Sequence, residues 1–283
     1  MMQPSGEVRT KTTPDGITYV ETFEPALKEN RLLSFDQVMA LEETRRVKHA
    51  VPERKTDFFS FTYQNRPYNV FIKRHFPFSP ARFIRERIRL ASTKTAYDEF
   101  ENILAFLRAG IPTMMPIAAG KRKCGLWGTR SFLMTEAIEG CMTLEQFAET
   151  VWGKTGFQDK KRLILNVARL TRKMHDCGFN HRDYYLCHLL IGVAERNRDE
   201  LFVMDLHRVD IREKVPERWI IKDLAALYYS CLPYDISRTN KLRFFKDYLS
   251  CGKLSVRDKD FALKVIDKSR RMLKHAGRKK LEA

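Results

Sequence analysis

The chain has 283 residues, of which 43% are hydrophobic and 31% charged, a composition typical of a globular protein long enough to bury a core. Lysine and arginine outnumber aspartate and glutamate by 52 to 35, and the formal net charge of +17 predicts a polyanionic partner: nucleic acid, an anionic membrane surface or a phosphorylated substrate. The six cysteines are scattered without a Cys-x-x-Cys pair, which argues against a disulfide framework or a zinc site and favours a reducing cytosol.

The N-terminal region and the apolar runs bear on targeting. Residues 1–16 are polar and interrupted by proline and glycine, so we expect them to be loosely held and not to form a signal peptide. The longest nearly apolar run, residues 224–234, is far shorter than the roughly 20 residues that span a bilayer. We therefore expect a soluble protein whose membrane contacts are peripheral.

Strands are predicted in the first third of the chain. Residues 17–23 favour a short strand, and Ser34 is placed to cap a short helix. Aromatic and β-branched residues over 58–63 and 68–72 flank a polar turn and predict a β-hairpin. Its second strand leads into Lys73, where a kinase keeps the lysine that pairs with the α- and β-phosphates.

Two helices are predicted next. Residues 79–90 form a basic amphipathic pattern, which suits either an anionic membrane surface or an ordinary solvated helix face. Residues 95–109 place Glu99 in the first turns, where a kinase glutamate orients the strand lysine, and Glu101 is the alternative. The following strand ends at Glu136 and resembles a hinge strand whose backbone groups would bind adenine.

Beyond the hinge the pattern becomes helical, and two aspartates stand beside short apolar strands. Residues 181–183 read His-Arg-Asp, and the apolar run 201–204 ends at Asp205. In phosphoryl transfer one carboxylate accepts the proton of the attacking hydroxyl and another holds Mg²⁺, roles that suit Asp183 and Asp205 respectively. Asp223, in the first turns of a helix, is placed to tie the backbone of the 181–183 loop.

These features occur in kinase order, and three motifs resemble the lipopolysaccharide core heptose kinases. The motifs are residues 180–190 (Asn-His-Arg-Asp-Tyr-Tyr-Leu-Cys-His-Leu-Leu), residues 205–208 (Asp-Leu-His-Arg), and Arg218-Trp219 with residues 222–228. The resemblance runs from about residue 70 to residue 245 and implies an α+β, two-lobed, protein-kinase-like fold. We expect an N-terminal extension over 1–45, a small β-rich N-lobe over 46–137, and a larger helical C-lobe over 138–283.

The resemblance implies ATP-dependent phosphorylation of a heptose in the lipopolysaccharide inner core, with ATP and Mg²⁺ as cofactors. Lys73 and Glu99 would hold the nucleotide phosphates, and His181 and Arg182 would brace the loop. The partner would be an anionic glycolipid, met by a cytoplasmic protein bound peripherally to the inner membrane, and no nucleic-acid partner is expected.

Several positions depart from a protein kinase. His188 stands where a kinase has the asparagine for a second Mg²⁺, and Tyr185 replaces the usual lysine. No Gly-x-Gly-x-x-Gly precedes the hairpin, so the phosphate cover is expected within 47–56, near five basic residues: Arg45, Arg46, Lys48, Arg54 and Lys55. His188 is therefore a candidate metal residue beside Asp205, but imidazole is a softer ligand than an amide oxygen, so we expect it to coordinate Mg²⁺ through water or not at all.

Other functions stay open at this stage. The acceptor could be 3-deoxy-octulosonic acid (Kdo) or a protein hydroxyl, or the chain could be a catalytically silent kinase fold that binds glycolipid or protein. Retention of both Asp183 and Asp205 favours an active enzyme.

Overall fold

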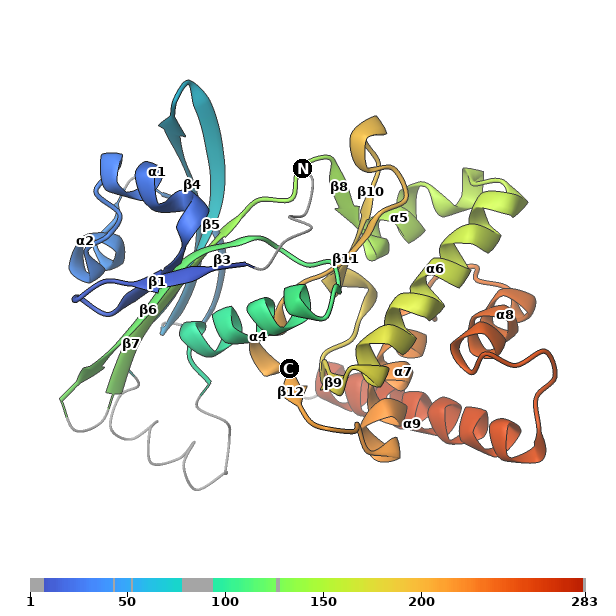
Figure 1. The fold of residues 1–283 in the computed structure, drawn as a ribbon. Helices are drawn as coiled ribbons and strands as arrows, with labels where there is room; N and C mark the ends of the chain where they lie inside the picture. Colours follow the sequence, from blue (N-terminus) through green and yellow to red (C-terminus); the bar gives the residue numbers. More distant parts are fainter. Residues whose placement is uncertain (1–7, 43, 52, 78–93, 126–127, 282–283) are drawn as a thin grey trace. The chain divides into compact units, whose positions relative to one another are not determined.

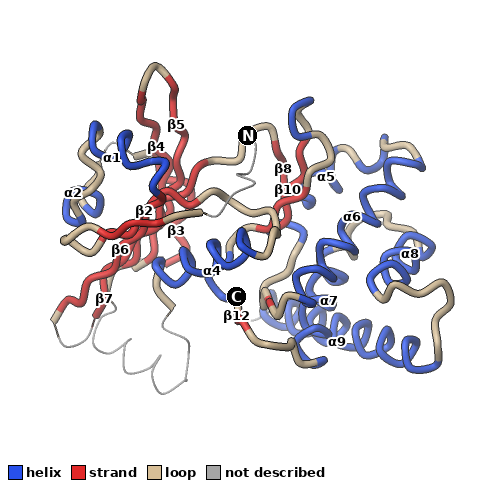
Figure 2. The backbone as a smooth tube through the Cα atoms, viewed as in Figure 1, coloured by secondary structure: helices blue, strands red, loops and turns tan. Residues whose placement is uncertain are grey.

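The computed structural model describes residues 8–42, 44–51, 53–77, 94–125 and 128–281 (Figure 1). The chain divides between Glu139 and Gly140 into two compact units, which we call the sheet half and the helical half. Strands gather in the first and helices in the second (Figure 2). The division lies two residues beyond the expected boundary at 137/138.

The described part of the sheet half contains a seven-stranded antiparallel sheet. Its strand order is β1-β2-β6-β7-β5-β4-β3. The strands are β1 Thr10–Thr12, β2 Ile17–Val20, β3 Arg45–Val51, β4 Arg54–Tyr63, β5 Arg66–His75, β6 Pro116–Cys124 and β7 Gly128–Glu136. The expected hairpin is β4–β5, and its pairing extends beyond the apolar pattern at both ends. Gln64 and Asn65 adopt the positive φ values of a tight hairpin turn, which lets the pairing continue to Tyr63 and Arg66.

Residues before 46 belong to this sheet and its core. β1 pairs with β2, and β2 pairs with β6, so residues 10–12 are not the loose segment that the sequence predicted. The short helices α1 (Glu24–Glu29) and α2 (Phe35–Met39) bury Leu27, Phe35 and Val38 in one cluster with residues of β5 and β7. The proline and glycine before Ile17 shape a turn that closes the β1–β2 hairpin.

Helix α4 (Ala96–Arg108) begins where the sequence predicted. Thr95 accepts a hydrogen bond from the Asp98 backbone N–H, and Asp98 accepts one from the Thr95 backbone N–H, which forms a capping box. Phe100, Ile103 and Phe106 are fully buried on one face. This start and this buried face fix the rotation of the helix and therefore which glutamate points toward the sheet.

The helical half combines long helices with short strands. Its helices are α5 Leu144–Thr150, α6 Phe157–Asp176, α7 Glu217–Ser230, α8 Arg238–Tyr248 and α9 Val256–Leu281. One small sheet has the order β11 (Leu201–Val203), β10 (Leu189–Gly192), β8 (Cys141–Thr143), and β12 (Asp210–Ile211) pairs with β9 (Phe179–Asn180). α6, α7, α8 and α9 share a core around Ala168, Ala225 and Val265.

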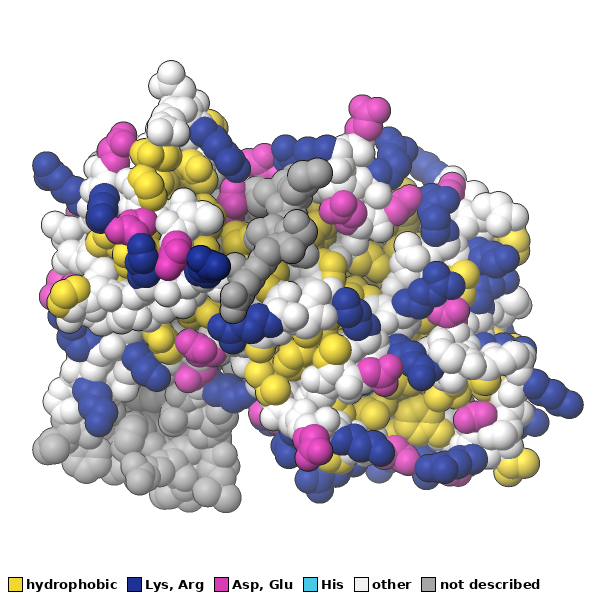
Figure 3. All heavy atoms as spheres, in the orientation of Figure 1, with side chains coloured by type: hydrophobic (Ala, Val, Ile, Leu, Met, Phe, Trp, Pro, Cys, Tyr) yellow, Lys and Arg dark blue, Asp and Glu magenta, His cyan; other side chains and the backbone are white. Residues whose placement is uncertain are grey.

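The described residues test only one of the two sequence-based expectations about membranes. The basic amphipathic helix predicted over 79–90 lies outside the described residues. Among the residues that are described, no helix is both long and apolar enough to cross a membrane. Lys and Arg side chains are spread over the face in Figure 3 and do not form one continuous patch.

Candidate active site

Lys73 of β5 and Glu99 of α4 form a close ion pair. The Lys73 Nζ lies 2.7 Å from Glu99 Oε1, and the Glu99 side chain is fully buried. Glu101, the alternative partner, is exposed on another face of α4. Since a buried carboxylate needs a cation and hydrogen bonds, Lys73 stabilises Glu99 while Glu99 fixes the direction of the ammonium.

Glu136, predicted to begin the hinge, lies at the end of β7. Its carboxylate is mostly buried and accepts a hydrogen bond of 3.3 Å from Arg66, and burial raises the pKa of Glu136 despite this cation. Its backbone N–H donates to the Met115 carbonyl, and that of Ala137 donates to the Asn69 carbonyl. These two donors are already used, so an adenine would need donors beyond Ala137.

The segment expected to cover the phosphates is the β3–β4 hairpin. Val51 pairs with Arg54 across its tip, and the register shifts twice along β3. Two of the predicted cations lie over aromatic rings: Arg45 over Phe58 at 5.5 Å and Lys55 over Phe76 at 5.1 Å from the ring centroids. The side chains of Arg46 and Lys48 lie outside the described residues.

In the helical half, Asp183 lies in a loop between β9 and β10. Both oxygens of its carboxylate accept hydrogen bonds from the Arg208 Nη1, at 2.9 and 3.0 Å. Asp183 is 17% exposed and Arg208 is 43% exposed, so both reach the surface of this half. Arg208 follows β11 and so brings a cation to Asp183 from 25 residues further along the chain.

Asp223 lies in the middle of α7, not in its first turn, and it fastens the loop that carries Asp183. Its Oδ2 accepts hydrogen bonds from the His181 N–H at 2.8 Å and the Asn180 side chain at 2.7 Å. Its Oδ1 accepts from the Arg182 N–H at 2.8 Å. The predicted supporting role of Asp223 therefore has a geometric basis: one fully buried carboxylate binds three successive residues of the loop.

The hydrogen bonds to Asp223 offset two unfavourable effects: the strained backbone at Arg182 and the burial of the Asp223 carboxylate. Arg182 has a φ of +71°, a conformation that L-residues rarely adopt and that persists only when the surroundings hold it. Burial alone would raise the pKa of Asp223, but hydrogen bonds from His175 and Asn180 and the charge interactions with His175 and His181 lower it. His175 is held in turn by the Tyr248 hydroxyl at 2.9 Å.

His181 links the two aspartates of the site through neutral hydrogen bonds. Its Nε2–H donates to the Met204 carbonyl at 3.0 Å, and its Nδ1 accepts from the Asp183 N–H at 3.3 Å. Both contacts are met by one neutral tautomer, and burial lowers the pKa of His181, which favours that neutral form. His181 therefore connects Met204, which precedes Asp205, with the backbone of Asp183.

Asp205 lies between two imidazoles. Its Oδ1 is 3.0 Å from His207 Nδ1, and its Oδ2 is 3.5 Å from His188 Nε2. His188 Nδ1–H donates to the Asp183 carbonyl at 2.7 Å. Burial lowers the pKa of His188, but contacts with the Cys187 side chain, the Asp183 carbonyl and the Asp205 carboxylate outweigh burial and raise it to about 9.

The donor chemistry of this pair fits a divalent cation. Asp205 offers carboxylate oxygens, and His188 offers Nε2 once it loses a proton, with Nδ1–H already bound to a carbonyl as in metal-bound histidines. Among the described residues, no group of three or more His, Cys, Asp or Glu side chains gathers as a protein-only metal site. Mg²⁺ commonly binds one or two protein carboxylates and completes its shell with phosphate oxygens and water.

Sequence reasoning missed four contributors. Arg208 and His207 lie in the Asp-Leu-His-Arg motif, which the sequence analysis recognised without assigning a role to either residue. His175 and Tyr248 stabilise Asp223 from 48 and 25 residues away, and no local pattern marks them. Their hydrogen bonds depend on how α6, α7 and α8 pack.

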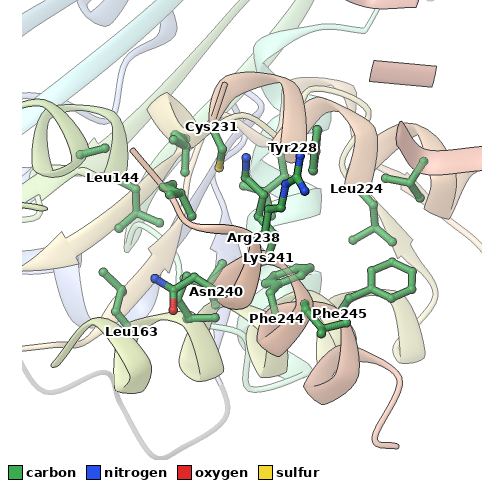
Figure 4. Close-up of a pocket in the computed structure, with 18 of the residues that line it drawn as sticks. Leu144, Leu163, Leu224, Tyr228, Cys231, Arg238, Asn240, Lys241, Phe244 and Phe245 are labelled. Carbon is green, nitrogen blue, oxygen red and sulfur yellow. The ribbon is translucent and has the colours of Figure 1, made fainter. Parts of the chain in front are cut away.

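An apolar cavity of about 390 Å³ lies inside the helical half (Figure 4). Side chains from all five long helices of this half line it, and Phe244 and Phe245 of α8 form part of its wall. Its polar lining residues lie at the start of α8: Arg238, Asn240 and Lys241. Leu186, from the loop that carries Asp183, also lines the cavity and is thereby connected to the candidate site.

Residues 42–248 match the model of the lipopolysaccharide kinase (Kdo/WaaP) family. A lipopolysaccharide core heptose(I) kinase WaaP from Pseudomonas aeruginosa is 37% identical over 158 residues, which cover 54% of this chain and 59% of the relative. A 3-deoxy-D-manno-octulosonic acid kinase from Actinobacillus succinogenes is 24% identical over 52% of this chain and 59% of its own. This chain thus spans about three fifths of either relative's length.

A solved structure described as WaaP in complex with acyl carrier protein superposes with a TM-score of 0.68 at 28% identity. The match covers 91% of this chain and 98% of that chain. The sheet-rich first half, the helical second half and this match agree with the two-lobed kinase-like fold that the sequence predicted.

Proposed function

The chain belongs to the lipopolysaccharide kinase (Kdo/WaaP) family, and we propose that it transfers the γ-phosphoryl group of ATP to a hydroxyl of a heptose in the lipopolysaccharide inner core. The observation that carries the proposal is the Asp183 carboxylate, presented on a strained loop that Asp223 fastens and paired with Arg208. The heptose is preferred over 3-deoxy-octulosonic acid because identity to the heptose kinase is higher, 37% against 24%.

In the proposed reaction Asp183 accepts the proton of the heptose hydroxyl as its oxygen bonds to the γ-phosphorus. The bond from the γ-phosphorus to the bridging oxygen breaks, and ADP leaves with that electron pair. Arg208 keeps both oxygens of Asp183 in place and adds positive charge beside the reacting group. His181, by holding the Asp183 backbone, limits the directions that the carboxylate can take.

We assign a role toward the nucleotide to residues of each half separately. Lys73, oriented by Glu99, would contact the α- and β-phosphates, and backbone groups beyond Ala137 would meet the adenine. Asp205, with His188, would hold Mg²⁺, which neutralises phosphate charge when it is bound. On this basis we assign the role of a kinase N-lobe to the sheet half and that of a C-lobe to the helical half.

The site of action that we propose is the cytoplasmic face of the inner membrane, with peripheral attachment. The net charge of +17 favours an anionic glycolipid substrate and the anionic surface in which it is embedded. Vesicle flotation at 50 and 500 mM salt tests this attachment, because a charge-driven contact weakens as salt screens it. Equal flotation at both salt concentrations would contradict it.

The activity is tested with radiolabelled ATP, Mg²⁺ and core lipopolysaccharide that lacks core phosphate. Asp183→Asn should lower transfer by about 10³-fold, the usual scale of a general base, while ATP binding persists. Asp205→Asn should also abolish transfer, and Asp267→Asn, on the exposed face of α9, is the matched control. Transfer at the wild-type rate by Asp183→Asn would refute the assignment of Asp183 as the base. Label found on octulosonic acid after hydrolysis would refute the heptose as the phosphate acceptor.

A second binding function is favoured by the cavity of Figure 4. The WaaP structure contains an acyl carrier protein, and we propose that this chain also binds an acyl carrier protein, with the acyl chain in the apolar cavity. Ala262→Phe would fill the cavity, whereas Leu263→Phe, exposed on the same helix, would not. Acylated carrier should bind at least tenfold more tightly than unacylated carrier, and only Ala262→Phe should remove the difference. Equal binding of the acylated and the unacylated carrier would exclude the cavity as the binding site of the acyl chain.

A further inference from the structure

Three cations surround the indole of Trp219 in the helical half. The guanidinium carbons of Arg182 and Arg218 lie 5.6 and 5.3 Å from the ring centroid, and the Lys222 ammonium lies 5.2 Å from it. We call these four residues the Trp219 cluster. Arg218, Trp219 and Lys222 belong to the motif at residues 218–228, and the proposed reaction uses none of them.

The positive charge of the Trp219 cluster is not balanced. Arg182 shares the Asp210 carboxylate with Arg212, at 3.4 and 3.7 Å. Neither Arg218 nor Lys222 forms an ion pair with a carboxylate of a described residue. On α7, Asp223 is buried and bound to the loop backbone, and Glu217 pairs with Lys264 at 3.4 Å. Within the described part of the chain, Arg218 and Lys222 therefore share one indole ring and neither is paired with a carboxylate.

The pKa of Lys222 reflects its burial and the neighbouring positive charges. It is about half buried, and burial followed by the charges of Arg182 and Arg208 lowers its pKa, although Asp183 and Asp223 oppose this. A lysine on an ordinary solvated helix face would extend its ammonium into water and avoid its neighbours. Arg182 Nε and Trp219 Nε1 are also buried donors without a partner among the described residues. An anion bound here would relieve both the repulsion and the unmet donors.

The Trp219 cluster also lies beside the proposed base. Arg182 immediately precedes Asp183, and Arg208, whose charge acts on Lys222, holds the Asp183 carboxylate. All of these residues belong to the helical half. A ligand anion at the Trp219 cluster would therefore lie close to a hydroxyl that reaches Asp183.

We propose that Arg182, Arg218 and Lys222 around Trp219 form a subsite for an anionic group, a carboxylate or a phosphate, that the acceptor glycolipid carries beside the sugar that is phosphorylated. This inference rests on the proposed function for the identity of the acceptor. It adds the chemistry by which the acceptor is selected: a glycolipid without an anionic group beside the heptose would leave the cations unpaired, whereas one with such a group would neutralise them.

The direct test measures the Lys222 pKa in the full chain. Lysines are ¹³C-dimethylated, and Lys222→Arg identifies the resonance of Lys222. We expect 3-deoxy-octulosonic acid to raise the Lys222 pKa and its methyl ester to leave it unchanged. Inorganic phosphate, titrated separately, decides whether a phosphate binds more tightly than a carboxylate. No response to the sugar acid or to phosphate, or a response only to Mg-ATP, would overturn the proposal.

Kinetics supply an independent readout. Lys222→Met and Arg218→Gln should each raise the KM for the acceptor at least tenfold, the scale of one charge-assisted hydrogen bond, while the KM for ATP stays within twofold. Lys259→Met, an exposed lysine of α9, controls for the lost charge. A rise in the KM for ATP alone would assign these cations to the nucleotide. If the wild type phosphorylates no core acceptor, the proposed function fails, but the titration still decides whether the anion subsite exists.

Discussion

The two halves hold their candidate site residues in different ways. In the sheet half, Lys73 and Glu99 stand on a strand and a helix, and one ion pair joins them. In the helical half, Asp183 and Asp205 stand on loops with positive φ at Arg182 and at Asp205 itself. There a buried carboxylate, two histidines and a tyrosine are needed to hold the loop around Asp183.

The difference follows from where the backbone hydrogen bonds are made. A residue on β5 or α4 has its backbone fixed by the element, so only its side chain must be oriented. A residue in the 181–188 loop has N–H groups that the loop itself does not satisfy, and buried donors without partners are costly. Asp223 satisfies two of them and thus replaces the missing secondary structure. The halves should therefore respond differently to single substitutions.

The largest expected effect is that of Asp223→Ala. The change leaves the N–H groups of His181 and Arg182 without an acceptor and leaves a cavity beside His175. We expect the free energy of unfolding of the helical half to fall by about 3–5 kcal/mol, the usual effect of breaking a buried charged contact. Urea denaturation followed by tryptophan fluorescence measures it, with Asp267→Ala as the exposed control. A loss below about 1 kcal/mol would mean that the loop does not depend on Asp223.

Glu99→Gln should separate activity from stability in the sheet half. The neutral amide can accept a hydrogen bond but cannot form an ion pair with the Lys73 ammonium, and a less firmly directed lysine should lower phosphate transfer by about 10²-fold. The denaturation midpoint should change little, because β5 and α4 keep their own backbone hydrogen bonds. Glu101→Gln, two residues away and exposed, should leave both quantities unchanged. Equal losses from both variants would exclude a specific role for the Lys73–Glu99 pair.

Gly178→Ala tests the entry into the loop. Gly178 has a φ of +83°, and an added Cβ would lie 1.8 Å from the Arg212 carbonyl oxygen, so β9 and β12 would have to separate. We expect a loss of about 2 kcal/mol in unfolding free energy together with reduced transfer. Gly153→Ala, where nothing lies within 4 Å, is the matched control. Wild-type stability for Gly178→Ala would show that the β9–β12 pairing is not fixed.

The smallest expected effect is a pH dependence that involves His188. Its pKa is raised from the ordinary 6.5 to about 9, so the folded state binds the proton more tightly than the unfolded state. This contribution to stability is fully present below pH 6.5 and is lost as the pH rises through about 9. His188→Gln should remove this slope from unfolding free energies measured between pH 6 and 10, and the exposed His275→Gln should retain it. A slope that persists in His188→Gln would assign it to another group.

The sequence by itself determined the local features of this protein. The capping box at Thr95, the hairpin around residues 64–65 and the apolar face of α6 follow from short spacings that the backbone repeats. The order of the motifs and their resemblance to one kinase family likewise predicted the fold and the segments that carry Asp183 and Asp205. These features depend on residues within about one helical turn or one strand of each other.

Only the tertiary structure decided which distant side chains meet. Arg208 reaches Asp183 across 25 residues, Tyr248 reaches His175 across 73, and residues 10–20 join the sheet beside β6. No spacing rule encodes such contacts, because they depend on how loops return helices to one another. Packing also brings Arg182 to Trp219, 36 residues before Arg218, whereas Arg218 and Lys222 lie within about one helical turn of the indole.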